Sequence, residues 1–260
     1  MKTTSLILSS IIFLILASAK PALGQDFPLR SKYLQETFIT TAELAATEKQ
    51  VIIVDVRDQM EFNVLHIDGA KLLPVETLKL EELQALRPVG DTRRIVFYCN
   101  GITCEKSYKA AAKAALWEFP NTCVYDAGIF VWAKAYPERS LFFGITLTGE
   151  KASTALIAQP RFDAVCLEPE AFKARTADPA YKVYDIRERS DRVARPMTFN
   201  NDIRLTMDAF VAALDKGEIP KAKILIYDNV GKQVTWLQYY LEKYGIKEYY
   251  FLRGGVRAIQ

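Results

Sequence analysis

Two cysteines five residues apart, Cys99 and Cys104, are the side chains of this chain best suited to covalent chemistry. Cys99 follows residues 95–98, whose apolar run predicts a buried strand, and precedes a helical pattern over residues 107–116. A cysteine between a strand and a helix faces backbone N–H groups and the positive end of the helix dipole, which favour its thiolate. The sequence therefore predicts a reactive Cys99 in a loop that binds the substrate through Asn100, Gly101, Ile102, Thr103 and Cys104.

The role of Cys104 stays open between two interpretations. It is either a resolving thiol that forms a disulfide with Cys99, which exported thiols do readily, or a small residue that fills the loop.

The chain contains two copies of one pattern. Asp55 and Cys99 are separated by 44 positions, and Asp185 and Asp228 by 43, so the second copy carries aspartate where the first has cysteine. Short runs rich in Val, Ile and Tyr alternate with helical patterns in both copies, which indicates parallel sheets covered by helices. Ligand sites in such sheets lie beyond the carboxyl ends of the strands, where Cys99 falls. A carboxylate lacks the nucleophilic sulfur of a thiol, so only the first copy is predicted to be reactive.

The repeat sets the expected domain organisation. We expect a first domain over residues 36–137, a polar linker over residues 138–162 that could add a strand to one domain, and a second, inactive domain over residues 163–260. The second domain is expected to be a structural half or to bind a protein partner.

The first 24 residues have the pattern of an export signal. Lys2 precedes an apolar stretch over residues 6–17, and small residues lie before Gln25. We expect export, to the periplasm if the source is a Gram-negative bacterium, with no membrane span after removal of the signal. An uncleaved N-terminal anchor is the alternative. Removal of the signal leaves 32 basic residues against 31 acidic ones, a balance that argues against binding of nucleic acid.

Several other chemistries lack the residues that they need. A phosphatase loop requires an arginine, and residues 100–105 contain none. His66 is the only histidine, so neither a Cys–His dyad of the papain kind nor a metal cluster is expected, and we predict no cofactor. His66 itself is expected to have a structural role.

Three further sets of residues are expected to be structural. Asp55 with Arg57, and Asp185 with Arg187, should form ion pairs at strand ends, with substrate binding as the alternative for Arg57. Cys123 should be a buried strand residue. Cys166, which matches Phe38 in the first copy, should also be packed, although a disulfide between the two cysteines stays open. An aromatic cluster forms either core or a contact surface: Trp236, Tyr239, Tyr240, Tyr244, Tyr249 and Tyr250.

Over nearly all of its mature length the chain resembles a tandem rhodanese, a family of sulfurtransferases. The motifs that carry the resemblance are Asp55-Val56-Arg57, Glu61-Phe62 leading to residues 66–70, the Cys99 loop, and Asp126-Ala127-Gly128 followed by Trp132. The resemblance implies two rhodanese-like α/β domains, each a parallel five-stranded sheet flanked by helices on both faces. One departure is Cys104, because many loops of this kind carry an arginine about five residues after the cysteine.

The resemblance also implies an activity. Cys99 would accept sulfane sulfur as a persulfide from a donor such as thiosulfate and pass it to a thiophilic acceptor, cyanide or a thiol. Two alternatives remain at this point: a non-catalytic binding module that senses redox state or sulfide, and thiol-disulfide exchange through Cys99 and Cys104.

Overall fold

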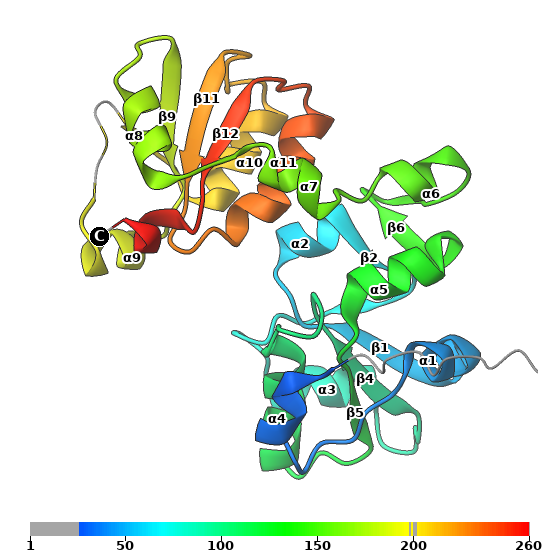
Figure 1. Ribbon diagram of the computed structural model, residues 1–260. Helices are drawn as coiled ribbons and strands as arrows, with labels where there is room; N and C mark the ends of the chain where they lie inside the picture. The colour runs from blue at the N-terminus through cyan, green and yellow to red at the C-terminus, as the bar shows by residue number, and fades with distance from the viewer. Residues whose placement is uncertain (1–25, 198, 200–201, 260) are drawn as a thin grey trace, which may run out of the picture.

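The computed structural model describes residues 26–197, 199 and 202–259, which form two α/β lobes (Figure 1). The expected signal segment, residues 1–24, lies outside the described residues. Within the described ranges, no helix has the length and hydrophobicity needed to cross a membrane.

The first lobe is built on a parallel sheet in the order β3-β1-β4-β5. Phe38 adds a single parallel bridge to Val124, held by two backbone hydrogen bonds that join Val124 to Thr37 and Ile39. The expected five-stranded sheet is therefore four strands and a bridge, because Thr40 begins a helical capping box two residues after Phe38 and takes the chain out of the sheet. The strands are β1 (Val51–Asp55), β3 (Lys71–Leu72), β4 (Arg94–Tyr98) and β5 (Thr122–Tyr125).

Successive side chains along each strand of this sheet point to opposite faces and pack into two separate hydrophobic clusters. Ile52, Val54 and Phe97 pack on one face, with α3 and α4, while Ile53 and Val96 pack on the other, with α1, α2 and α5. Both faces are therefore covered, as expected. The helices are α1 (Thr41–Thr47), α2 (Gln59–Val64), α3 (Leu80–Leu86), α4 (Lys106–Leu116) and α5 (Gly128–Ala135).

The second lobe has the expected five-stranded parallel sheet, in the order β10-β9-β11-β12-β8. Its strands are β8 (Cys166–Leu167), β9 (Tyr181–Asp185), β10 (Asp202–Arg204), β11 (Lys223–Tyr227) and β12 (Tyr249–Leu252). Its helices are α8 (Pro169–Thr176), α9 (Arg189–Ala194), α10 (Met207–Asp215) and α11 (Gln233–Lys243). The two parallel sheets confirm the two-domain α/β layout.

The two lobes repeat each other in detail. Phe38 pairs with Val124 of β5, and the matched Cys166 pairs with Phe251 of β12. The helices that follow the central strands, α4 and α11, are both 11 residues long. The residue after each of their C-caps, Glu118 or Gly245, has a positive φ. The elements that flank the loops before α4 and α11 therefore correspond, so that these two loops can be compared.

The expected linker contains more structure than its polar sequence indicates. β6 (Ser140–Phe142) and β7 (Ile145–Thr146) form a hairpin that extends β2 (Leu65–Ile67) into a three-stranded antiparallel sheet, so the linker does add a strand to the first lobe. The helices α6 (Glu150–Thr154) and α7 (Gln159–Asp163) are five residues each, too short to show a helical period. Single 3-10 turns occur at Pro28–Lys32, Glu48–Gln50, Pro137–Arg139 and Gly255–Ala258.

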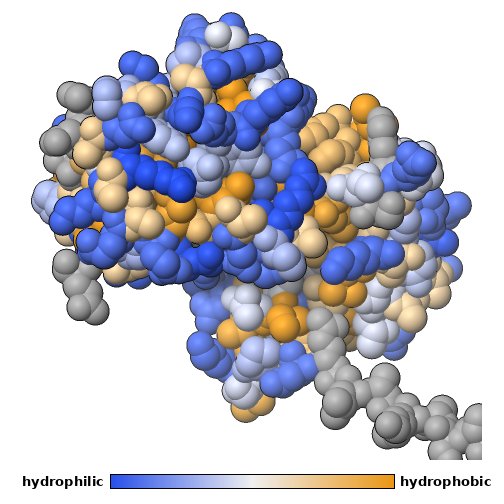
Figure 2. Space-filling model, turned by 45° about the horizontal axis from the view of Figure 1, so that its top comes forward, coloured by the Kyte–Doolittle hydropathy of each residue, from blue (hydrophilic) through white to orange (hydrophobic). Residues whose placement is uncertain are grey.

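One face of α11 packs the second lobe onto the first. Trp236 stacks on Phe130 of α5 at 5.2 Å between ring centroids, and the Tyr240 hydroxyl donates a hydrogen bond of 2.9 Å to the carbonyl of Met60 in α2. Trp236, Tyr239 and Tyr240 are buried, so this part of the aromatic cluster is a contact surface within the chain. On the face shown in Figure 2, hydrophilic residues are interrupted by separate hydrophobic patches.

Candidate active site

Cys99 lies directly beyond the carboxyl end of the central strand β4. Its side chain is fully buried, and its Sγ is 3.3 Å from the carbonyl oxygen of Cys104 and 3.3 Å from the Ser107 hydroxyl. Ser107 is the second residue of α4, whose first turn therefore faces the sulfur. The strand end and the helix start bring the thiol to the position that the sequence predicted.

The backbone at Gly128 packs directly against the loop that follows Cys99. Its φ is +77°, and a Cβ at this position would lie 2.4 Å from the Cα of Gly101. The neighbouring amide of Ile129 donates a hydrogen bond of 3.0 Å to the carbonyl of Cys99. The close approach of these two backbones requires glycine at position 128.

Asn100 is held by hydrogen bonds on both ends of its amide. Arg57 donates a bond of 3.1 Å to its Oδ1, and its Nδ2 donates a bond of 2.6 Å to Glu61. Arg57 itself is fully buried in a bidentate pair with Asp55, as the sequence predicted. The ion pair of Arg57 and Asp55 is therefore connected to the loop by the side chain of Asn100. Arg57 is thus a residue that positions the loop.

Sequence reasoning missed the connection between Glu61 and Asn100, although the repeat contains a signal for it. In the second lobe Asn229, which matches Asn100, donates a hydrogen bond of 3.0 Å to Asp191, which matches Glu61. A carboxylate and an asparagine thus recur at the same two positions.

At the mouth of the loop, one lysine lies among three carboxylates. Lys106 lies 3.3 Å from Glu61, 3.8 Å from Asp58 and 3.7 Å from Glu76. Although burial opposes its ionisation, the charges of Lys106 and Arg57 and the amide of Asn100 hold the pKa of Glu61 below its ordinary value. The positive charge of Lys106 is therefore shared among carboxylates.

The expectation that Cys99 is the thiolate is wrong for this geometry. Burial and the neighbouring Cys104 thiol raise the pKa of Cys99 well above its ordinary value, and the Ser107 hydroxyl and amide offset this only in part. A hydrogen bond with Cys99 lowers the pKa of Cys104 to about 7, assisted by the amides of Asn100 and Lys106, which outweigh burial. Cys104 is also partly exposed. Of the two thiols, Cys104 is therefore the one whose ionisation the loop favours.

The remaining predicted loop residues lie closer to the protein surface than the buried Cys99. Gly101 makes the backbone turn that returns to Cys104 through a hydrogen bond of 2.8 Å. Ile102 is partly exposed and Thr103 is exposed, so both form the rim of the loop. Cys104 is the predicted loop residue whose side chain interacts with that of Cys99.

The matched loop of the second lobe is filled by its own aspartate. The buried carboxylate of Asp228 accepts hydrogen bonds from the amides of Gly231, Gln233 and Val234 at 2.5, 2.7 and 3.4 Å. Several N–H groups directed at one point form an anion-binding cradle. A negative group is therefore already bound there.

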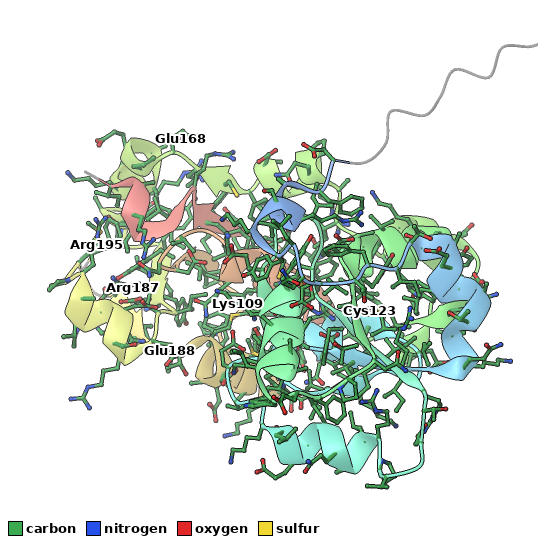
Figure 3. All side chains as sticks on the ribbon, turned by 90° about the horizontal axis from the view of Figure 1, so that it is seen from below. Lys109, Cys123, Glu168, Arg187, Glu188 and Arg195 are labelled. Atoms are coloured by element: carbon green, nitrogen blue, oxygen red, sulfur yellow. The ribbon has the colours of Figure 1, made fainter. Side chains whose placement is uncertain are left out.

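The other candidate residues are structural. All four cysteines are free thiols, and Cys123 is buried within the first lobe, away from the labelled residues of the second lobe (Figure 3). His66 stacks on Phe62 at 3.8 Å and bonds to the Phe62 carbonyl, consistent with a structural role. In the second lobe, Arg187 pairs with Asp185 as Arg57 pairs with Asp55 in the first. Arg187 also donates a hydrogen bond to the carbonyl of Arg195, which lies beside it (Figure 3).

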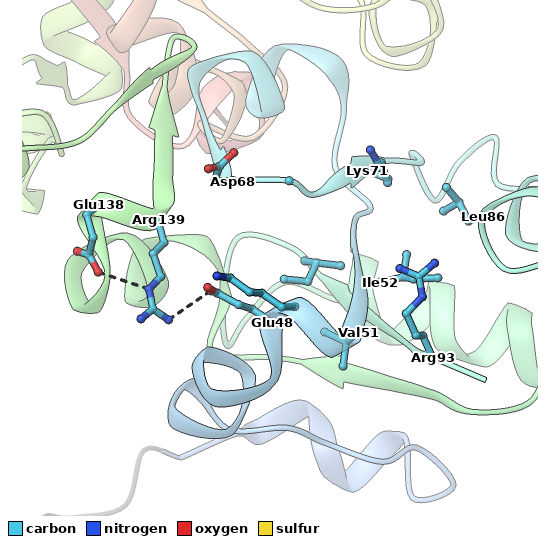
Figure 4. Close-up of a pocket in the computed structure, with 12 residues that line it drawn as sticks. Glu48, Val51, Ile52, Asp68, Lys71, Leu86, Arg93, Glu138 and Arg139 are labelled. Atoms are coloured by element: carbon cyan, nitrogen blue, oxygen red, sulfur yellow. Dashed lines mark ion pairs between the residues drawn. The ribbon is translucent and has the colours of Figure 1, made fainter. Parts of the chain in front are cut away.

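A separate hollow of about 410 Å³ lies at the opposite end of the first sheet (Figure 4). Val51 and Ile52, at the start of β1, line it, and Arg139 pairs there with Glu48 and Glu138 at 3.3 and 3.5 Å. No cysteine is among its lining residues, so the hollow is not part of the thiol site.

Comparison with known proteins assigns a family to part of the first lobe. Residues 40–135 match the rhodanese-like domain family, so the first lobe contains a rhodanese-like domain. An 87-residue stretch, 33% of the chain, is 33% identical to the probable adenylyltransferase/sulfurtransferase MoeZ of Mycobacterium tuberculosis, in each of two strains. The chain spans about a fifth (21%) of the length of these curated relatives.

Two solved structures illustrate the range of similarity. The BH2092 protein of Bacillus halodurans is 27% identical, with 42% of this chain and 80% of that chain covered at a TM-score of 0.36. A thiosulfate sulfurtransferase of Pseudomonas aeruginosa is 18% identical, with 85% and 42% covered at a TM-score of 0.39.

Proposed function

We propose that the protein is an exported sulfurtransferase of the tandem rhodanese type. It moves sulfane sulfur from a donor such as thiosulfate to a thiol or cyanide, and Cys99 carries the sulfur as a persulfide. The observation that carries the proposal is the position of Cys99, at the end of the central strand of a rhodanese-like domain and against the first turn of α4.

The chemistry balances without an added oxidant. A loop thiolate attacks the outer sulfur of thiosulfate, the S–S bond of thiosulfate breaks, and sulfite leaves with the electron pair. The persulfide then gives its outer sulfur to the acceptor and returns to a thiol. The N–H groups at the start of α4 favour a negative sulfur at this point.

The second domain has no thiol at the matched position, since Asp228 stands there. We assign it a structural role: α11 contacts α2 and α5, and Trp236 lies 5.1 Å from the guanidinium of Arg57. A protein partner that binds the second domain is compatible with this assignment.

Mass spectrometry after incubation with thiosulfate tests the activity. We expect a stable one-sulfur adduct in the wild type and strongly diminished sulfur transfer by Cys99→Ala, which lacks the buried carrier, whereas Cys166→Ala, a change at a partly exposed cysteine of the second lobe, should behave like the wild type. Undiminished turnover of thiosulfate and cyanide by Cys99→Ala would contradict the proposal.

The same measurement identifies the alternatives. Loss of two hydrogens without added sulfur would indicate thiol-disulfide exchange between Cys99 and Cys104, and no change in mass would favour a non-catalytic sensing module. Export is tested on the protein recovered from its source cells, where we expect an N-terminus at Gln25 and a periplasmic location.

A further inference from the structure

The loop before α4 is two residues longer than its counterpart in the second lobe. α4 begins seven residues after Cys99, whereas α11 begins five residues after Asp228. The two helices match from their first residues, so the extra residues lie in the loop that contains Cys104. The additional length allows the chain to turn back toward Cys99, so that the carbonyl oxygen of Cys104 lies 3.3 Å from Cys99 Sγ.

The longer loop changes what the cradle holds. In the second lobe, the amide of Gln233 donates to the Asp228 carboxylate. In the first lobe, the amides of the matched Lys106 and of Asn100 instead lower the pKa of Cys104. The N–H groups at the start of α4 therefore favour a negative charge on Cys104 as well as at the position of Cys99.

The two thiols also differ in access. Cys99 is fully buried, whereas Cys104 is partly exposed next to the exposed Thr103. A donor that approaches from solvent meets Cys104 first. The same holds for a bulky thiol acceptor, which cannot reach a buried sulfur.

We propose that Cys104 is a catalytic residue that receives sulfane sulfur from the donor and relays it to Cys99, and that returns it to the acceptor by the reverse step. This inference rests on the proposed sulfurtransferase function and assigns the point of exchange with solvent to Cys104. Cys99 is then the buried carrier.

The relay is a balanced exchange. In the first step the Cys104 thiolate takes the outer sulfur of thiosulfate and sulfite leaves. In the second step Cys99 attacks the outer sulfur of the Cys104 persulfide, so that a Cys99 S–S bond forms as the Cys104 S–S bond breaks. The proton of Cys99 moves to the Cys104 sulfur, and no net oxidation occurs.

The test uses the full chain in three variants: Cys99→Ser, Cys104→Ser and, as a matched control, Cys166→Ser. Each is mixed with thiosulfate, quenched at short times with an alkylating agent, and digested so that mass spectrometry locates the added sulfur. Thermal unfolding checks that each variant is folded, and Cys104→Ala provides a second side chain at that position.

We expect Cys99→Ser to carry sulfur on Cys104, and Cys104→Ser to load Cys99 at least about tenfold more slowly than the wild type, since one pKa unit between two thiols corresponds to a tenfold difference in thiolate. The control should load like the wild type. Loading of Cys99 at the wild-type rate in both Cys104 variants would overturn the relay.

Two other outcomes have distinct meanings. A Cys99–Cys104 disulfide formed with release of sulfide would also overturn the relay, because Cys104 would then have attacked the inner sulfur of the persulfide. If neither the wild type nor any variant takes up sulfur from thiosulfate, the proposed function fails and the relay fails with it.

Discussion

Asn100 in the thiol loop accepts a 3.1 Å hydrogen bond from Arg57, a fully buried side chain at the end of the neighbouring strand. The same guanidinium is paired with Asp55 and lies against Trp236 of the second lobe. The orientation of the loop is therefore linked both to a buried ion pair and to the packing between the lobes.

Replacement of Arg57 tests this link. Arg57→Met should destabilise the protein by about 3–5 kcal/mol, because it leaves the carboxylate of Asp55 buried without its partner. Arg187→Met provides a matched control, since Arg187 forms the same buried pair in the second lobe. Denaturant unfolding should give a smaller loss for Arg187→Met, because Arg192 lies 3.4 Å from Asp185 and still partners its carboxylate. Only Arg57→Met should slow sulfur loading under conditions in which each variant is folded, and equal loading by both would show that Arg57 does not position the loop.

Alanine substitutions at two glycines with the same φ distinguish the cost of steric contact from the cost of backbone strain. Gly128 and Gly144 both have φ +77°, but a Cβ on Gly144 would meet nothing within 4 Å. Gly144→Ala should therefore cost only the left-handed backbone penalty of about 1–2 kcal/mol. Gly128→Ala should cost about 1–3 kcal/mol more, because it also displaces the loop at Gly101. Urea unfolding measures both, and equal losses would mean that the backbone contact at Gly101 is easily relaxed.

Alkylation of Cys104 should depend on pH. Its rate should rise as the pH increases through about 7, because the thiolate is the nucleophile and is the form present above the pKa. Cys99→Ala removes the hydrogen bond that contributes most to this low pKa, so the midpoint should move to higher pH. Cys123, whose pKa burial raises to about 11, should stay unlabelled near neutral pH. Iodoacetamide labelling followed by peptide mapping gives all three profiles, and an unchanged midpoint in Cys99→Ala would refute the interaction.

The stability of the loop before α11 should depend on the carboxylate of Asp228. Asp228→Asn replaces one acceptor oxygen by an NH₂ group that meets backbone N–H donors, at a cost of about 1–3 kcal/mol. Asp178→Asn is a suitable control, because Asp178 is exposed and accepts a single backbone hydrogen bond from Ala180. Thermal unfolding compares the two. Sulfur loading on the first lobe should be unaffected in both.

Much of the architecture could be predicted because local sequence determines it. The runs before Cys99 and Asp228 are buried strands, and the expected helix over residues 107–116 begins one residue earlier in the structure. The same holds for the Asp55–Arg57 pair, which lies within three residues of sequence. Repetition of the pattern indicated which residues correspond.

The ionisation of the thiols could not be predicted in this way. The helix dipole and loop amides argued for a Cys99 thiolate, but the outcome depends on burial of Cys99 and on the position of a second thiol, which only the folded loop defines. The short helix α7 was missed for a related reason, since it is held by contacts with the second lobe, where Phe162 stacks on Phe251 and Asp163 pairs with Arg253, rather than by a periodic sequence.

The aspartate of the second loop has a consequence for selectivity. A carboxylate attached to the chain is present at a high effective concentration in its own cradle and competes with every free anion in solution. The carboxylate therefore disfavours small free anions in that loop, and under the proposed function the loop of Cys99 is the one that receives an anionic sulfur donor. The second loop has no thiol, but its cradle is not empty, because the Asp228 carboxylate accepts its N–H groups.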